Sequence, residues 1–195
     1  DKYNIYIHYK KDSPLKYLDK FKLSSTVDTC WGCLSVVLAQ NHILKEALKD
    51  PNNQHFIWLS QACIPLKPFN YIYNTLDTTK SYFNLFPDSD RFPRANNLLK
   101  YISKDKIKKA AMPSVINRKH AELFIYNEWE LNNWFKNIKN VDELAYITLL
   151  HYYNLEEELV LTDFMAADSV VFAPWVKMKN YKPFKKSGTY FWKIP

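Results

Sequence analysis

The sequence predicts an α/β fold, with a three-layer α/β/α domain built on a mixed, mostly parallel sheet. Three observations lead to this prediction. Apolar, β-rich runs alternate with segments whose apolar residues recur at helical spacing, as in chains that alternate strands and helices. The length of 195 residues suits one domain, so residues 1–195 are expected to form a single unit. The hydrophobic content of 47% is ample for a core and argues against global disorder.

The first half of the chain is expected to supply three strands and two helices. "YNIYIHY" (residues 3–9) is β-rich and predicts a buried strand. From Trp31 to Leu48 the apolar residues recur at helical spacing, and "DPNN" ends that helix. The other elements are the strand "HFIWLS" (55–60), the short helix "NYIYNTL" (70–76) and the strand "KSYFNLF" (80–86).

The second half begins with a polar, irregular region that follows "PDSDRFPR" and extends to about Lys109. "AMPSVINRKHAELFIYN" (111–127) predicts a strand that runs into a helix. "DELAYITLLHYY" (142–153) predicts a further helix with Asp142 as its N-cap. The strand "ELVLTDF" (158–164) and a lysine-rich tail complete the chain.

The net charge of +7 is unevenly distributed. Residues 176–195 contain six lysines and no acid, and residues 100–119 contain seven basic residues and one acid. Residues 122–163 reverse the balance, with nine acids and two lysines. This segregation predicts one electropositive region and one carboxylate-rich region. A nucleic-acid binder would explain the basic charge but not the acidic block. The chain has no zinc-finger, RNP or helix-turn-helix pattern, so no nucleic acid is expected as a partner.

The small residues and the thiols exclude several kinds of site. Only two glycines are present, which excludes the glycine-rich phosphate loops, so a bound nucleotide must be held by side chains. The three cysteines are too few for a disulfide framework. "CWGC" has CxxC spacing but no second pair, which argues against zinc. Cys30 and Cys33 are expected as free thiols, one turn apart at the start of a helix.

The segment "FIWLSQACIPL" (56–66) indicates a ligand site. Its apolar run stops at Ser60, a lone Cys63 follows, and Pro65 forces a turn. A buried strand that ends in this way usually presents its last residues to a ligand. Composition, charge and residue spacing do not identify this ligand.

Five motifs answer that question by their order: "WGCLSVVLAQNHILKEAL", "FIWLSQACIPL" with "YIYNTL", "VINRKHAELF", "DELAYITLL" and "TYFWKI". The succession resembles the core-2/I-branching β-1,6-N-acetylglucosaminyltransferase-like family, and most closely its plant-type branch, in which a Ser-x-x-Cys-Ile-Pro-Leu motif is usual. The resemblance implies a GT-A-like fold, an inverting mechanism, a UDP-sugar donor and no essential metal cofactor. It covers the chain from about Tyr3 to Lys193.

Inverting sugar transfer needs a base for the acceptor hydroxyl and positive charge for the departing diphosphate. Glu143 matches the family's catalytic glutamate, and the alternative is that Asp142 and Glu143 are ordinary acids of a helix N-terminus. Lys193 matches a family lysine that stabilises the leaving group, although Trp192 replaces the preceding arginine. The second basic contact is expected among four upstream lysines, Lys177, Lys179, Lys185 and Lys186.

"PDSD" contains a literal DxD, the motif through which many GT-A enzymes hold Mn²⁺ or Mg²⁺. The order of the motifs places the metal position instead at the end of "FIWLS", where the chain has Gln61, Ala62 and Cys63. "PDSDR" is therefore interpreted as a turn, because Pro, Asp and Ser are turn formers. A metal held by Asp88 and Asp90 is the minority alternative, and Ser60 to Pro65 is expected to floor a nucleotide-sugar site without metal ligands.

The resemblance implies further contacts. His8, Ser60 and Cys63 are expected near the nucleotide sugar, although Lys10 replaces a family aspartate after His8. A lone histidine at the end of a strand is more often structural. The acceptor is expected to meet basic or aromatic side chains, which bind carbohydrate faces, although core packing is as common for the aromatic ones. The acceptor candidates are Arg91, Arg94, Phe164 and Trp175.

The predicted function is an inverting, metal-independent glycosyltransferase that moves N-acetylglucosamine or xylose from a UDP-sugar to a glycan or glycoprotein hydroxyl. The alternative is a non-catalytic nucleotide-sugar or glycan-binding module of the same fold, because Lys10, Trp192 and Met112-Pro113 depart from the family pattern. The chain carries no signal peptide or long apolar run. Its relatives are usually anchored in the secretory pathway, so a membrane is expected only through an N-terminal segment absent from this sequence, which begins almost inside a strand.

Overall fold

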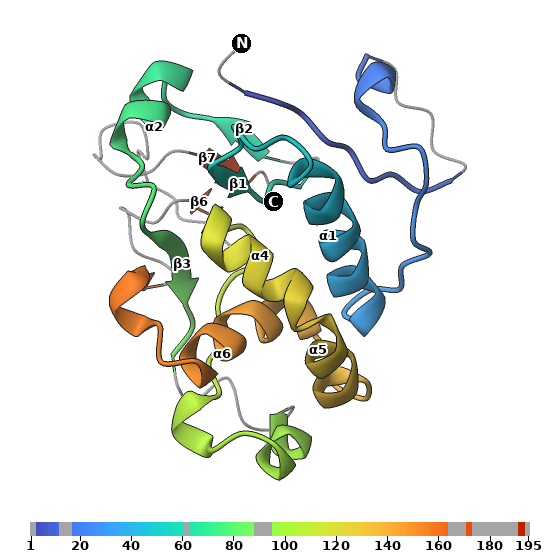
Figure 1. The fold of residues 1–195 in the computed structure, drawn as a ribbon, viewed down its shortest axis with the longest axis vertical. Coiled ribbons are helices and arrows are strands. Elements are labelled where there is room, and N and C mark those ends of the chain that lie inside the picture. The colour runs from blue at the N-terminus through green and yellow to red at the C-terminus, as the bar shows by residue number, and fades with distance from the viewer. Residues whose placement is uncertain are drawn as a thin grey trace, which may run out of the picture.

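The computed structural model describes residues 3–11, 17–60, 63–87, 95–163, 171–172 and 191–193. It confirms the α/β class with a mixed sheet, in which strands and helices alternate along the chain (Figure 1). The main sheet has four strands in the order β1-β4-β3-β5. Their bounds are His55–Ile57 for β1, Val115–Asn117 for β4, Ser81–Leu85 for β3 and Leu159–Asp163 for β5.

The direction of these strands decides where a site can form. β4 is antiparallel to both β1 and β3, whereas β3 and β5 are parallel. The strands β1, β3 and β5 therefore run in the same direction, and their carboxyl ends meet at one edge of the sheet. We call this edge the carboxyl edge.

A second sheet has three strands in the order β2-β7-β6. β2 (Cys63–Pro65) is antiparallel to β7 (Phe191–Lys193), which is parallel to β6 (Val171–Phe172). Antiparallel pairing thus has a larger part among the described strands than the sequence indicated. The reason is that β4 and β7 each enter a sheet opposite in direction to a strand from the first half of the chain.

Four helices lie together beside the main sheet, and α6 is the most deeply buried of them (Figure 1). Every residue of α6 from Ala145 to His151 is buried, as expected for a helix that is apolar on all faces. The Phe124 ring of α4 stacks on the Tyr146 ring of α6, with centroids 4.2 Å apart. The helices are α1 (Leu34–Ala47), α4 (Arg118–Tyr126), α5 (Glu128–Phe135) and α6 (Ala145–Tyr152), while the short helix α2 spans Phe69–Thr75.

Short 3-10 helices link these elements. One of them, η5, directly precedes α6 and contains Glu143. Of the others, two lie in the connection from β3 to β4 and one leads directly into β5. Their bounds are Asp19–Phe21 for η1, Asn96–Lys100 for η3, Lys104–Lys106 for η4, Val141–Glu143 for η5 and Glu156–Glu158 for η6.

Two expectations about local structure were wrong, and one helix was not predicted. Residues 3–9 form only an isolated bridge, Ile7 with Lys22. Its two main-chain hydrogen bonds run from the Ile7 N–H to the Phe21 carbonyl and from the Leu23 N–H to the Ile7 carbonyl. Asp142 is not the N-cap of α6, since the intervening turn η5 moves that position to Leu144, which makes no side-chain capping bond. Helix α5 was not predicted because its Asn and Glu residues obscure the buried pair Leu131 and Phe135.

The expectation of free Cys30 and Cys33 thiols was also wrong, because these residues form a disulfide. They lie in a turn ahead of α1, not within its first helical turn, and Cys33 is the N-cap of that helix. Their Cα atoms are 5.5 Å apart, within the range that a disulfide spans. Cys63 is free.

Four histidines are expected to make the fold sensitive to mild acid. Burial lowers the pKa of His8, His55, His120 and His151 below the ordinary value of 6.5. Below that pH the unfolded chain binds more protons than the folded one, so the free energy of unfolding should fall as pH decreases from about 7 toward 5. Each histidine contributes at most about 1.4 kcal/mol per pH unit.

Urea unfolding between pH 5 and pH 8 measures this dependence. His120 is fully buried, with Nδ1 2.7 Å from Ser81 Oγ and Nε2 3.1 Å from Glu158 Oε2. The His120→Gln variant should therefore show a shallower slope in that window. A slope equal to that of the wild type, or a protein that becomes more stable toward pH 5, contradicts the expectation.

Candidate active site

The carboxyl edge is lined by the segment 109–114, which precedes β4. Ala110 forms a bridge with Leu85 at the end of β3, and the Trp58 N–H after β1 donates to the Ser114 carbonyl at 2.9 Å. The segment thus crosses the ends of two strands that run in the same direction. In open α/β sheets, ligands bind at this kind of edge.

Glu143 lies at this edge. Its main-chain carbonyl accepts a hydrogen bond from the Ala110 N–H at 2.8 Å. The turn η5 ends at Glu143, just before the buried helix α6. The backbone of Glu143 is therefore fixed both by the hydrogen bond from Ala110 and by the helix that follows. Its side chain is 24% exposed, which leaves the carboxylate accessible to a ligand.

Two side chains orient the Glu143 carboxylate. Lys109 Nζ lies 3.3 Å from Oε2, and Asn140 Nδ2 donates to the same oxygen at 3.5 Å. Lys109 Nζ also lies 4.0 Å from the centroid of the Phe86 ring, directly after β3. Both of these polar contacts involve Oε2. As far as the described residues show, Oε1 is left to accept a proton. The arrangement suits a general base held beside a cation.

The structure also brings Cys63 and Lys193 together. They lie directly opposite each other in the β2–β7 pair, although they are far apart in the sequence. Ser60 Oγ is 3.5 Å from Cys63 Sγ, and the Cys63 N–H donates to the Ser60 carbonyl. Cys63 also packs against a small apolar cluster. Ser60, Cys63 and the backbone of Lys193 therefore lie close together in the chain that follows β1, and their role at a nucleotide sugar stays a prediction.

His8 has a structural partner. Its Nε2 accepts a hydrogen bond from the Val27 N–H at 2.9 Å, which ties the first segment of the chain to the loop before α1. The ring is neutral in this bond, and burial lowers its pKa. The predicted contact between His8 and a nucleotide remains a prediction, and it would have to use the other ring nitrogen.

Several predicted site residues lie outside the described residues. They comprise the acceptor candidates, most of the basic candidates for the leaving group and the two acids of the metal alternative. Among the residues that the structure describes, no group of three His, Cys, Asp or Glu side chains is placed to hold a metal ion. The candidates outside the described residues are Arg91, Arg94, Phe164, Trp175, Lys177, Lys179, Lys185, Lys186, Asp88 and Asp90.

The sequence did not single out Lys109 or Asn140. Lys109 was visible only as one of seven basic residues in the segment 100–119. Asn140 carries a weak signal, because asparagine is one of the few residues that readily adopt the left-handed backbone found there, with φ +56°. Their placement beside Glu143 depends on contacts between elements, which local patterns do not reveal.

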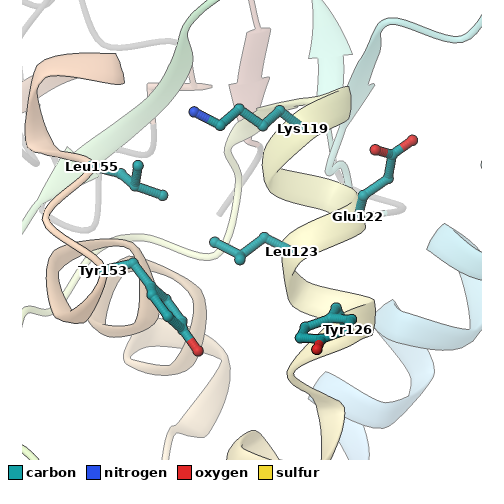
Figure 2. Close-up of a pocket in the computed structure, with 6 residues that line it drawn as sticks. All are labelled: Lys119, Glu122, Leu123, Tyr126, Tyr153 and Leu155. Atoms are coloured by element: carbon teal, nitrogen blue, oxygen red, sulfur yellow. The ribbon is translucent and has the colours of Figure 1, made fainter.

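A separate groove of about 490 Å³ lies between α4 and the end of α6 (Figure 2). Tyr126 and Tyr153 line its two sides, with Leu123 between them. Its two charged side chains are paired elsewhere, Lys119 with Glu158 and Glu122 with Arg118. Glu143 precedes α6 and Tyr153 follows it, so the groove is at the opposite end of that helix from the candidate base. It offers a binding surface whose acid and base are both held in ion pairs.

The helices within the described ranges include none that is both long and apolar enough to cross a membrane.

Two comparisons with known proteins agree with each other. A family model described as Core-2/I-Branching enzyme matches residues 1–187. The chain is also similar to a protein of rice (Oryza sativa subsp. japonica) named glycosyltransferase BC10, with 29% identity over 119 residues. The match covers 60% of this chain and 30% of the rice protein, so the chain spans less than a third of that relative.

Proposed function

Because the chain belongs to the Core-2/I-branching enzyme family, we propose that it is a glycosyltransferase that uses a UDP-sugar donor and a glycan or glycoprotein acceptor. The proposal treats residues 1–195 as one GT-A-like domain. N-acetylglucosamine and xylose are the sugars proposed for transfer. The name of the rice relative supports the reaction class.

The proposed reaction is a single displacement with inversion. The acceptor oxygen attacks the anomeric carbon, the bond from that carbon to the diphosphate oxygen breaks, and the hydroxyl proton passes to Glu143 Oε1. Lysine side chains, with Lys193 foremost, stabilise the negative charge of the departing UDP, so the reaction needs no essential metal. Lys109 holds the other oxygen of the base, which keeps Oε1 directed at the acceptor.

One observation carries this proposal. Glu143 is a partly exposed carboxylate at the carboxyl edge, with Lys109 and Asn140 both bound to one of its oxygens. A carboxylate that served only as a helix N-terminal acid would need no such pair of partners. The pairing of Cys63 with Lys193 supports a nucleotide-sugar site beyond the end of β1.

A thermal-shift titration with UDP in excess EDTA tests the donor, with ATP and pyrophosphate as controls. A ligand present at about 100 times its dissociation constant stabilises the folded state by roughly 2.7 kcal/mol. Of the three compounds, we expect only UDP to raise the melting temperature. An equal response to all three compounds would indicate only a basic patch. A shift that requires Mn²⁺ would contradict the metal-independent mechanism and favour Asp88 and Asp90 as ligands.

A non-catalytic nucleotide-sugar or glycan-binding module is the second candidate. Met112 and Pro113, which depart from the plant-type pattern, lie in the segment that lines the carboxyl edge beside Lys109. A change at this place can alter acceptor binding or abolish turnover. Measurable release of UDP from a UDP-sugar distinguishes an enzyme from such a module.

A further inference from the structure

The turn ahead of α1 is built in an unusual way. A disulfide joins Cys30 to Cys33, and the Cys33 N–H donates to the Cys30 carbonyl at 3.2 Å. Between them, Gly32 has φ +68°, and a Cβ atom added there would lie 2.9 Å from Asn140 Oδ1. Only glycine fits this backbone conformation and this close approach. One of the two glycines of the chain is therefore used to bring the turn against Asn140.

Asn140 links this turn to Glu143. Its N–H donates to the Gly32 carbonyl at 2.7 Å, in a left-handed conformation with φ +56°. Its carbonyl accepts from the Glu143 N–H at 3.1 Å, and its Nδ2 donates to Glu143 Oε2 at 3.5 Å. Asn140 thus holds the candidate base through both its main chain and its side chain. Asn140 is in turn held by the turn that the disulfide closes.

We propose that Asn140 and the Cys30–Cys33 disulfide form a positioning device for Glu143. The inference rests on the proposed function, since it assumes that Glu143 is the base. The disulfide restrains the turn, the Gly32 carbonyl fixes Asn140, and Asn140 directs the carboxylate toward the acceptor. The catalytic group remains Glu143, and Asn140 acts through it.

The device also responds to reduction. A dithiol reductant such as dithiothreitol transfers two electrons and two protons to the disulfide, which gives two thiols and the cyclic disulfide of the reductant. Cys30 is exposed, so the reductant can reach it. Without the cross-link the turn loses a restraint on Gly32, and the segment 140–144 becomes less ordered. Turnover then falls while the rest of the fold is retained.

The first test compares Asn140→Gly with Asn154→Gly. Both positions have φ +56°, so glycine suits both backbones, and only Asn140 contacts Glu143. Misplacing a catalytic group by about 1 Å can cost about 100-fold in rate. We expect Asn140→Gly to lower kcat by about 10- to 100-fold with the donor KM changed less than about twofold, and Asn154→Gly to leave both parameters near wild type. Equal kcat values in the two variants overturn the proposal.

The second test needs no activity. Hydrogen exchange of residues 140–144 is followed before and after addition of dithiothreitol. Two amides of this segment report on the device, because the Asn140 N–H donates to the Gly32 carbonyl and the Glu143 N–H donates to the Asn140 carbonyl. We expect about tenfold faster exchange in the reduced protein and in the Cys30→Ser/Cys33→Ser variant, which should not respond further to reductant. Unchanged exchange overturns the role of the disulfide.

The two hypotheses fail in different ways. If Glu143→Gln transfers sugar normally, the base assignment fails and the positioning role falls with it. If Glu143→Gln is inactive while Asn140→Gly and the reduced protein are fully active, the positioning role alone is wrong.

Discussion

Replacing Glu143 with glutamine is expected to reduce the rate of sugar transfer by about 10²- to 10⁴-fold, the usual contribution of a general base. The amide keeps the size of the side chain and can still meet Lys109 and Asn140 through its oxygen, but it cannot accept the proton of the acceptor hydroxyl. The loss should therefore appear in kcat, with the donor KM nearly unchanged. Initial rates of UDP release, measured with saturating donor, give both parameters.

Asp142→Asn is the matched control for this variant. It removes a neighbouring carboxylate of the same turn, and we expect its rate to remain within about threefold of wild type, because the side chain is not assigned to the reaction. Both variants should melt near the wild-type temperature. A Glu143→Gln enzyme that retains full activity, or equal losses in the two variants, would refute the assignment of the base.

Replacing Phe124 with alanine is expected to lower the free energy of unfolding by about 3–5 kcal/mol, as is typical when a buried phenylalanine is truncated. Phe124 is fully buried in α4, and its ring stacks on Tyr146 of α6 at a centroid distance of 4.2 Å. The variant leaves a cavity between these helices that rigid neighbours cannot fill. Urea unfolding monitored by circular dichroism measures the change.

Tyr126→Ala is the control for the Phe124 variant, because it lies on the same helix and is 87% exposed. We expect its loss to remain below about 0.5 kcal/mol. A loss of less than about 1 kcal/mol for Phe124→Ala, or similar losses in both variants, would mean that the α4–α6 contact does not hold the core together. Because α6 directly follows Glu143, this contact also supports the candidate active site.

Local patterns were sufficient to predict several elements. The apolar runs of β1, β3 and β5 and the strand-to-helix switch from β4 to α4 appear where the sequence predicts them. These segments have strong periodicity or β-rich composition. The burial of β3 and β4 agrees with it, whereas β5 is largely exposed. The order of the motifs, as distinct from their periodicity, led to the family.

Contacts between distant segments were not predictable from the same patterns. Nothing local in "CIPL" indicates that Cys63 pairs with Lys193, and nothing in "KIKKA" indicates that Lys109 meets Glu143. The disulfide was missed because a helix was extended back to Trp31, whereas Gly32 adopts a left-handed turn before it. The Cys63–Lys193 and Lys109–Glu143 contacts depend on where the chain returns after a long interval, which sequence spacing does not encode, whereas the disulfide joins residues only three apart and depends on the local turn.

The most direct test of the central claim is an assay of UDP release over a panel of UDP-sugars in excess EDTA, with and without candidate glycan acceptors. The account predicts that at least one donor releases UDP, that an acceptor accelerates the release, and that Glu143→Gln loses the acceleration. A protein that binds UDP under the same conditions yet releases none from any donor would contradict the account and identify a non-catalytic binding module.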